Sequence, residues 1–400
     1  MNLMPTRQWN IAESGLSPAL FTLSRTTRAN YFDRSLKLRI AEAHAPRIEY
    51  SPATGRCLGL VIEGAGTNML PNSETIQNWA QSATNTASNS LVAPDEQTTG
   101  ELMAETASTA EHFVSQTITV VPGQSYSISG FLRLGSREFG AIFVNTDIVY
   151  AVTINLITGG ITKISGNPTN VSVSPVAGGW WFIKFSFLTV SATSALVRLY
   201  ALADGTFNNR SYLGVITNNL GVFGVSMYNS SFPQSYFVTT TVAAARAAET
   251  YLISGSNFLS FWNTFEGSLT FHGSTGTDSS QRFLFCIDDA TANNRIAVSI
   301  TGSVLTFTIV TGSVTQATIS VDIGYTSGGM VGVGISFRQN LMALSVNGLP
   351  TITELSIAIP TVTRLSLGNA LSANYMYGYV AKLSYYNKAI PDYLPDFSAL

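Results

Sequence analysis

Residues 47–74 carry the sequence RIEYSPATGRCLGLVIEGAGTNMLPNSE. Ile48 and Tyr50 alternate with charged neighbours, and residues 58–62 form a second apolar run. Residues 51–55 between them combine a proline with a glycine, which is typical of a turn. We therefore predict a tight β-hairpin at this point of the chain.

On the C-terminal side of the hairpin, short alternating stretches follow one another without a helical segment. Residues 125–131 and 181–187 alternate at period two, and Asn347-Gly348 is a pair that favours a hairpin turn. Evenly spaced short strands predict β-sandwiches. We expect an all-β protein with two tandem β-sandwich (jelly-roll) domains after a short N-terminal hairpin region. The expected division is an attachment region and hairpin at 1–66, a jelly roll at 67–245 and a second sandwich at 246–400.

The hairpin resembles the linker of bacteriophage fibre and spike proteins, in which a similar hairpin opens a carbohydrate-binding-module-like jelly roll. The matching positions are Arg47, Tyr50, Pro52, Thr54, Gly55, Leu58, Gly59, Leu60, Ile62, Glu63, Thr67, Asn68, Leu70, Asn72, Ser73 and Glu74. Further landmarks, such as Gly178-Gly179-Trp180-Trp181 and residues 231–236, are similar to the jelly roll of that family. The last third resembles a concanavalin A-like, laminin-G-type sandwich, although Ala381 stands where many relatives place an aspartate.

The resemblance implies a virion protein, namely a fibre, spike or decoration subunit that projects from the particle and binds host-surface polysaccharide. It implies a homotrimer that contacts other virion proteins through its N-terminal region. Two alternatives stay open: an architectural capsid or tail cement protein that binds no sugar, and a polysaccharide depolymerase. The second alternative has less support, because the sequence lacks the carboxylate motif of glucanases with this fold.

The composition and the hydropathy pattern argue against nucleic-acid binding and membrane insertion. Charged residues make up 11% of the 400 residues and the net charge is -2, so no basic stripe is present for nucleic acid. No apolar run approaches the roughly 18 residues of a membrane helix. The N-terminus lacks a secretory pattern, so we expect synthesis in the host cytoplasm without Sec export. Cys57 and Cys286 are predicted to be unpaired.

No catalytic or zinc-binding motif is present, so we predict a non-enzyme without a dedicated cofactor. On the strand that holds both tryptophans, Trp181 is assigned to the core, which leaves Trp180 on the other face with Phe182. Trp180 is either a sugar-stacking platform, a subunit-interface anchor or a residue covered by a loop.

A second possible glycan contact is the loop of Asp288, Asp289, Asn293 and Asn294, whose oxygen atoms suit sugar hydroxyls or calcium. The alternative is a polar hairpin tip. Resemblance to calcium-containing jelly rolls makes Glu74 a candidate ligand for a structural calcium ion, against a solvated turn as the alternative.

Overall fold

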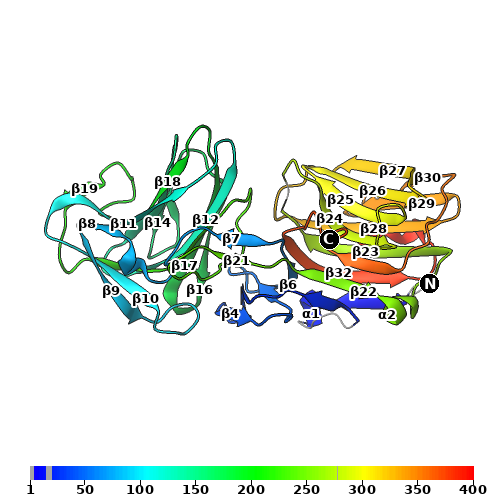
Figure 1. The fold of residues 1–400 in the computed structure, drawn as a ribbon, viewed down its shortest axis with the longest axis horizontal. Coiled ribbons are helices and arrows are strands. Elements are labelled where there is room, and N and C mark those ends of the chain that lie inside the picture. Colours follow the sequence, from blue (N-terminus) through cyan, green and yellow to red (C-terminus); the bar gives the residue numbers. More distant parts are fainter. Residues whose placement is uncertain (1–3, 15–19, 277) are drawn as a thin grey trace.

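The structure, a computed structural model, describes residues 4–14, 20–276 and 278–400. Two β-sandwiches lie side by side along the long axis, with the N-terminal strands beneath the joint between them (Figure 1). Almost all strand pairs are antiparallel neighbours in four large sheets. The prediction of an all-β fold is confirmed.

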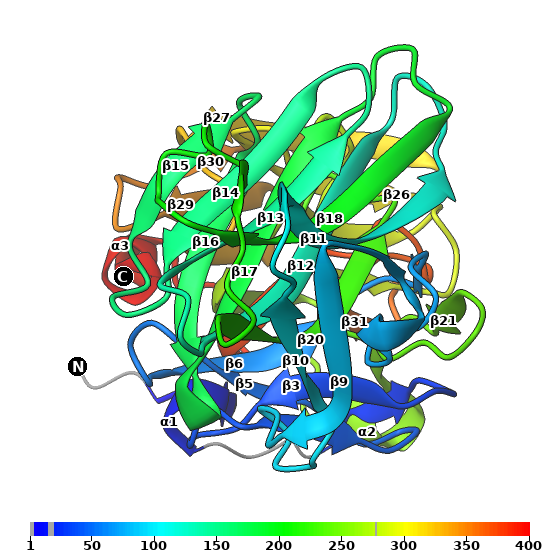
Figure 2. The ribbon, with the colours of Figure 1, turned by 90° about the vertical axis from the view of Figure 1, so that its left-hand side faces the viewer.

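The first sandwich is the jelly-roll-like unit on the left of Figure 1, and Figure 2 shows it from its outer end. Its core forms where side chains such as Ile128 and Phe185 from one sheet meet Ile142 and Val197 from the other. One sheet has the order β16 (Thr169–Val176), β17 (Trp180–Leu188), β12 (Ser125–Leu134), β20 (Asn219–Tyr228), β10 (Gly100–Glu105), β9 (Thr84–Leu91). The other has the order β15 (Ile161–Ser165), β14 (Val149–Asn155), β13 (Phe139–Asn145), β18 (Ser194–Leu202), β11 (Thr109–Thr119), β19 (Ser211–Leu213), with β8 (Ala80–Ser82) also on β11.

The second sandwich encloses a separate core that includes Leu60, Phe271, Phe285 and Leu383. Its first sheet has the order β30 (Ile352–Glu354), β29 (Leu341–Val346), β28 (Met330–Arg338), β23 (Glu266–Ser274), β32 (Gly378–Tyr386), β6 (Cys57–Ile62), β5 (Ile48–Tyr50), with β1 (Arg7–Asn10) also on β32. Its second sheet has the order β2 (Thr22–Ser24), β22 (Thr250–Ser254), β31 (Arg364–Leu367), β24 (Arg282–Asp288), β25 (Arg295–Thr301), β26 (Val304–Thr311), β27 (Val314–Asp322).

Helical segments are short. They are α1 (Ile11–Ser14), α2 (Gly255–Leu259) and α3 (Leu394–Ser398), with single 3₁₀ turns η1 (Ile76–Asn78), η2 (Ala177–Gly179) and η3 (Pro391–Tyr393). Within the described ranges, no helix has the length and apolarity needed to cross a membrane.

Both sequence-predicted turns are present. β5 and β6 form the hairpin, which the Gly55 N–H closes by donating to the Ser51 carbonyl oxygen at 2.7 Å. Asn347 and Gly348 both have positive φ after β29, as the Asn-Gly pair predicts. Cys57 and Cys286 are unpaired thiols.

The N-terminal strands belong to the second sandwich, which differs from the expectation of a separate attachment region at 1–66. β1 and β6 pair with β32, and β2 pairs with β22, so these strands complete both sheets of that sandwich. The physical reason is that isolated short strands cannot bury their apolar side chains. Here side chains such as those of Trp9 and Ile11 are buried in the core of the second sandwich of their own chain.

The hairpin of β3 (Ala29–Phe32) and β4 (Leu38–Ala41) reaches the other sandwich. Phe32 and Leu38 pack with Trp180 and Phe182 against the outer face of the jelly-roll sheet. A two-stranded link of β7 (Gly66–Asn68) and β21 (Ala244–Arg246) joins the sandwiches directly. The N-terminal residues therefore bridge the two sandwiches and create a junction between them.

Candidate functional site

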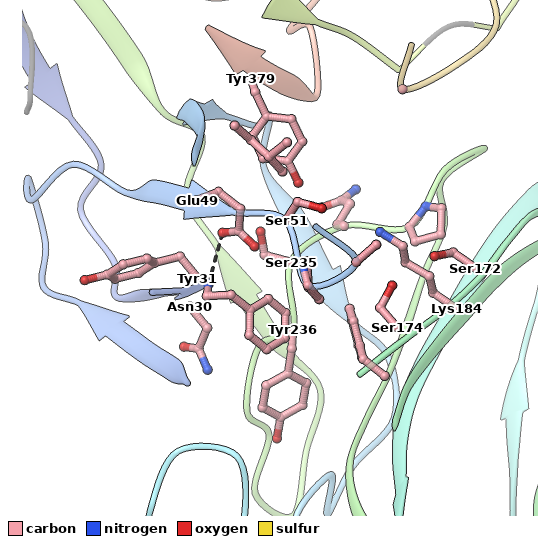
Figure 3. A pocket seen from close by; sticks show the side chains of 18 of the residues that line it. Asn30, Tyr31, Glu49, Ser51, Ser172, Ser174, Lys184, Ser235, Tyr236 and Tyr379 are labelled. Carbon is pink, nitrogen blue, oxygen red and sulfur yellow. Dashed lines mark hydrogen bonds between the residues drawn. The ribbon is translucent and has the colours of Figure 1, made fainter. Parts of the chain in front are cut away.

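A cavity of about 350 Å³ lies at this junction. Its size falls within the usual range of small-ligand pockets. β16 and β17 form one wall, β5 with its turn forms another, and β32 and the segment after β20 complete it (Figure 3). The lining side chains include the hydroxyls of Ser51, Ser172, Ser174 and Ser235, the rings of Tyr31, Phe182, Tyr236 and Tyr379, and the ionisable groups of Glu49, Glu63 and Lys184.

The β5–β6 hairpin places Glu49 at the cavity. Ile48 packs against the core of the second sandwich, so Glu49 points to the opposite face of β5. Glu49 lies opposite Gly59, where a Cβ atom would lie 2.2 Å from the carbonyl oxygen of Val380. Glycine at 59 thus allows β32 to approach the hairpin closely, and this approach sets the wall of the cavity.

The alternation of β17 places Lys184 on the facing wall. Ile183 and Phe185 point into the jelly-roll core, so Lys184 shares the outer face with Phe182. Ser172 of β16 lies directly across from Lys184 in the strand register. A cationic group and a hydroxyl group therefore lie side by side on this wall (Figure 3).

The carboxyl group of Glu49 is held in its neutral form. Burial raises its pKa to about 8, while the positive charge of Arg47 and the N–H of Phe32, which donates to Oε2 at 3.2 Å, act in the opposite direction. At pH 7 Glu49 is therefore mainly protonated and offers a hydroxyl donor to a ligand.

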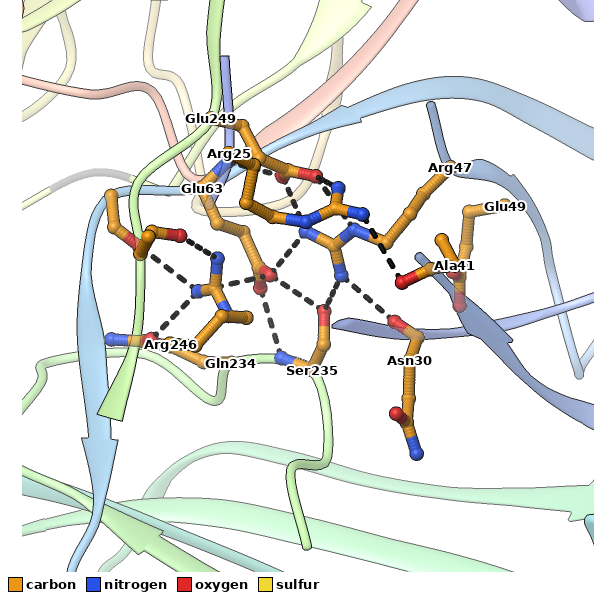
Figure 4. Close-up of polar contacts among 12 residues, drawn as sticks. Arg25, Asn30, Ala41, Arg47, Glu49, Glu63, Gln234, Ser235, Arg246 and Glu249 are labelled. Carbon is orange, nitrogen blue, oxygen red and sulfur yellow. Dashed lines mark hydrogen bonds and ion pairs between the residues drawn. The ribbon is translucent and has the colours of Figure 1, made fainter. Parts of the chain in front are cut away.

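A buried ion network holds the junction together (Figure 4). The side chain of Arg47 is inaccessible, and all of its N–H groups find acceptors. Nη1 donates to the Asn30 carbonyl at 2.8 Å and to Ser235 Oγ at 2.6 Å, and Nη2 donates to Glu63 at 2.7 Å. Nε donates to Glu249 at 2.8 Å, and Nη2 also contacts Glu249.

Arg25 and Arg246 extend this network to further chain segments. Arg25 pairs with Glu249 at 2.5 Å, and Arg246 lies 3.2 Å from Glu63. Burial alone would raise the pKa of Glu63, but Arg246, Arg47 and the hydroxyl of Ser235 lower it to about 2. The N-terminal strands, the end of the jelly roll and the interdomain linker are thus joined through buried ion pairs.

The structure places Trp180 in the interior. Its side chain is 0% exposed, and Nε1 donates to the Val92 carbonyl oxygen at 2.9 Å. The β3–β4 hairpin and residue Ala93 help to cover it. The prediction of Trp180 as a sugar-stacking platform is therefore wrong, because its apolar ring gains more from burial under the N-terminal hairpin. The strand assignment of Trp181 to the opposite, core-facing side is confirmed.

The Asp288 loop lies outside the junction cavity. Asp288 is 0% exposed, and its Oδ1 accepts from Arg364 Nε at 2.5 Å, so it cannot serve as a glycan contact. Asp289 accepts from Thr291 and from Asn294 Nδ2 at 2.8 Å.

The remaining two residues of the loop stabilise the neighbouring turn. Asn294 Oδ1 accepts from the Gly312 N–H at 2.9 Å, and the Asn293 carbonyl accepts from the Ser313 N–H at 2.9 Å. These oxygen atoms thus serve a polar hairpin tip. A glycan contact at Asp289, Asn293 and Asn294 stays a prediction.

Glu74 is half-buried beside the phenol of Tyr236, whose O–H donates to Oε1 at 2.7 Å. Burial raises the pKa of Glu74, and the nearby Asp95 adds to the shift. A raised pKa disfavours the anionic form that calcium requires. In the part of the chain that the structure describes, no group of three or more His, Cys, Asp or Glu side chains could hold a metal ion.

Sequence reasoning missed the junction cavity. Lys184 interrupts the apolar outer face of its strand two residues after Phe182, and this break was the available signal. Glu49 lies between Ile48 and Tyr50 inside the hairpin motif, but the pattern does not reveal what faces it. Only the pairing of remote segments places these two groups on facing walls.

No protein-family model and no curated protein sequence matches the chain. Solved structures give partial likenesses. A CBM40 of the Ruminococcus gnavus IT-sialidase, bound to alpha2,3 sialyllactose, is 14% identical over 36% of this chain and 88% of its own, with a TM-score of 0.32. The receptor-binding domain of a botulinum neurotoxin C/D mosaic serotype is 12% identical over 36% and 38%, with a TM-score of 0.30. The NanB sialidase from Streptococcus pneumoniae is 18% identical over 35% and 25%, with a TM-score of 0.31. Likenesses this partial assign neither a family nor a ligand to this chain.

Proposed function

We propose that this chain is a non-catalytic structural subunit of a bacteriophage particle that binds host-surface saccharide in the junction cavity. The observation that carries the binding function is the lining of the cavity. Hydroxyl groups of Ser172, Ser174 and Ser235 and the rings of Tyr31 and Tyr379 face one enclosed space. Sugars present hydroxyl groups and apolar ring faces, which such a lining can match through hydrogen bonds and stacking.

The phage role rests on the ordered sequence motifs that resemble fibre and spike proteins. In this role the chain forms a homotrimer, docks on other virion proteins through its N-terminal region, and resides in the virion. Several copies on one particle make weak individual sites effective, because later contacts become nearly intramolecular. Light scattering of the purified protein tests the oligomer, and a monomer at micromolar concentration contradicts it.

Two carboxyl groups with separated pKa values line the cavity, an arrangement that also occurs in glycoside hydrolases. The contacts of Glu63 argue against hydrolysis. Its Oε1 accepts from the Ser235 N–H at 2.9 Å, and its Oε2 accepts from Ser235 Oγ at 2.6 Å and from Arg47 at 2.7 Å. With both oxygen atoms engaged, Glu63 is poorly placed to attack a sugar or activate water. Release of reducing ends from polysaccharide by the protein would support a depolymerase instead.

Filling the cavity should abolish saccharide binding. Ser172 is half-buried on β16, so Ser172→Trp places an indole in the cavity with little change to the sheet. We expect labelled wild-type protein to bind host cells saturably, in competition with extracted surface polysaccharide, and Ser172→Trp to lose at least about tenfold in affinity, or about 1.4 kcal/mol.

Ser320→Trp is the matched control, since Ser320 is exposed on β27 of the other sandwich. It should bind like the wild type. Thermal unfolding identifies variants that fail to fold, and Ala53→Trp in the cavity-lining turn then replaces Ser172→Trp. Unchanged binding by a folded cavity-filled variant contradicts the proposed site, and an absence of wild-type binding favours the architectural alternative.

A further inference from the structure

Lys184 carries the one ammonium group among the described residues that line the cavity. Among the described residues it forms no ion pair, and its ammonium lies 5.9 Å from the centre of the Phe182 ring. Burial lowers the pKa of Lys184 from its ordinary 10.5, and the nearby Glu49 and Glu63 oppose that shift. These two carboxyl groups thus favour the charged, ammonium form of Lys184.

The charges of the junction do not balance. Arg25, Arg47, Arg246 and Lys184 are basic, whereas the carboxylates that form ion pairs with these arginines are Glu63 and Glu249. Two positive charges are left over while Glu49 remains protonated, because its pKa of about 8 lies above neutrality. A partly enclosed site with surplus positive charge attracts anions.

The three arginines of the network are poorly placed to bind a ligand in the cavity, because none of them lines it. Arg47 uses all of its N–H groups within the protein, and Arg25 donates to Glu249 and to the carbonyl groups of Ala41, Glu42 and Ala45. The group that remains accessible to a ligand is Lys184, next to Ser172 on β16 (Figure 3).

From this arrangement we propose that the junction cavity takes a carboxylated sugar unit, with its carboxylate against Lys184 and its hydroxyl groups against the serine side chains. The proposal rests on the proposed saccharide-binding function and names its ligand class. The single accessible ammonium matches the single charge of a carboxylate, and the neighbouring serine hydroxyl groups can donate to the hydroxyl and carboxylate oxygen atoms of the sugar.

Chemical modification of the polysaccharide tests directly whether the ligand is a carboxylated sugar. The probes are the extracted host polysaccharide, the same polysaccharide with its carboxyl groups reduced to alcohols, and the same polysaccharide after dephosphorylation. Binding to the full-length protein is measured by isothermal titration calorimetry at pH 7. We expect carboxyl reduction to weaken binding at least about tenfold and dephosphorylation to leave it unchanged.

Variants of the protein make the matching test. Lys184→Met should weaken binding of the native polysaccharide by at least about tenfold, and Lys184→Arg should keep most of the affinity because it keeps the charge. Lys163→Met is the control, since Lys163 is exposed on β15 away from the cavity. Lys184→Met should also lose its preference for native over carboxyl-reduced polysaccharide, an effect that a merely structural lysine would not produce.

The pH dependence gives an independent readout. The titratable and charged groups around Glu49 are Arg47 just before β5, Glu63 after β6, Lys184 on β17 and the phenols of Tyr31 and Tyr379. Raising the pH from 7 to 9 ionises Glu49, so wild-type binding should weaken as a second anion forms beside the ligand carboxylate. Glu49→Gln should remove most of this loss.

The outcomes separate the two proposals. Equal binding of native and carboxyl-reduced polysaccharide overturns the carboxylated ligand but leaves saccharide binding standing. If dephosphorylation abolishes binding and carboxyl reduction does not, the ligand is a phosphorylated sugar and the proposal of a carboxylated sugar is overturned. No binding of any polysaccharide by the folded protein overturns the proposed function, and the ligand class with it.

Discussion

Glu249→Ala should destabilise the protein by about 3–5 kcal/mol, because it leaves the buried cations Arg25 and Arg47 without their shared counter-charge. Both arginine side chains and Glu249 itself are inaccessible to water, so solvent cannot replace the lost carboxylate. The measurement is chemical denaturation of wild type and variant, followed by tryptophan fluorescence and circular dichroism.

Glu42→Ala is the matched control. Glu42 also pairs with an arginine, Arg28, but the two side chains are 65% and 66% exposed. Exposed pairs of this kind contribute at most about 1 kcal/mol, so this variant should unfold close to the wild type. If Glu249→Ala proves no more destabilising than Glu42→Ala, the network is not what stabilises the junction.

Trp180→Ala should lower the free energy of unfolding by a similar amount, about 3–5 kcal/mol, because it opens a cavity beneath the β3–β4 hairpin. The ring is 0% exposed, and its removal also deprives the Val92 carbonyl oxygen of a donor. Equilibrium denaturation measures the loss. A change below about 1 kcal/mol would contradict the packed interior position, since a surface tryptophan would cost that little.

Leu188→Ala is the control on the same strand. Leu188 is 49% exposed, so its truncation should change stability by no more than about 0.5 kcal/mol. Trp180→Ala also tests whether the packing of Trp180 and saccharide binding in the junction cavity are independent. Where the variant stays folded, its saccharide preference at the junction should persist, because Trp180 does not line that cavity.

Local sequence patterns were sufficient to predict strands such as β17 and the two hairpin turns. Alternation along β17 correctly divided Trp181 from Trp180, and the glycine at 55 correctly marked the turn of the β5–β6 hairpin. These features depend on local geometry, namely the two-residue period of a strand and the positive φ that glycine tolerates.

The candidate site could not be predicted in this way, because it depends on contacts between remote segments. Arg47 and Glu249 are 202 residues apart, and no periodic pattern links them. The cover over Trp180 likewise comes from Phe32 and Leu38, far away in the sequence. An apolar outer face on a strand predicts that something packs there, but not whether it is a ligand or the chain itself.

The placement of the N-terminal strands also depends on contacts between remote segments. Their apolar side chains required a partner, and the expected one was a neighbouring subunit or another virion protein. β32 and β22 of the same chain supply that partner instead. The consequence is the junction itself, since the bridging hairpin and the β5 strand bring Glu49 opposite the wall of Lys184.

The most direct test of the central claim is a crystal structure of the protein soaked with oligosaccharides cleaved from a surface polysaccharide that it binds. We expect a sugar ring in the junction cavity, with its carboxylate within hydrogen-bond distance of Lys184 and its hydroxyl groups near Ser172 and Ser174. A saccharide bound elsewhere, for example on the Asp289 loop, with the cavity holding only water, would contradict it.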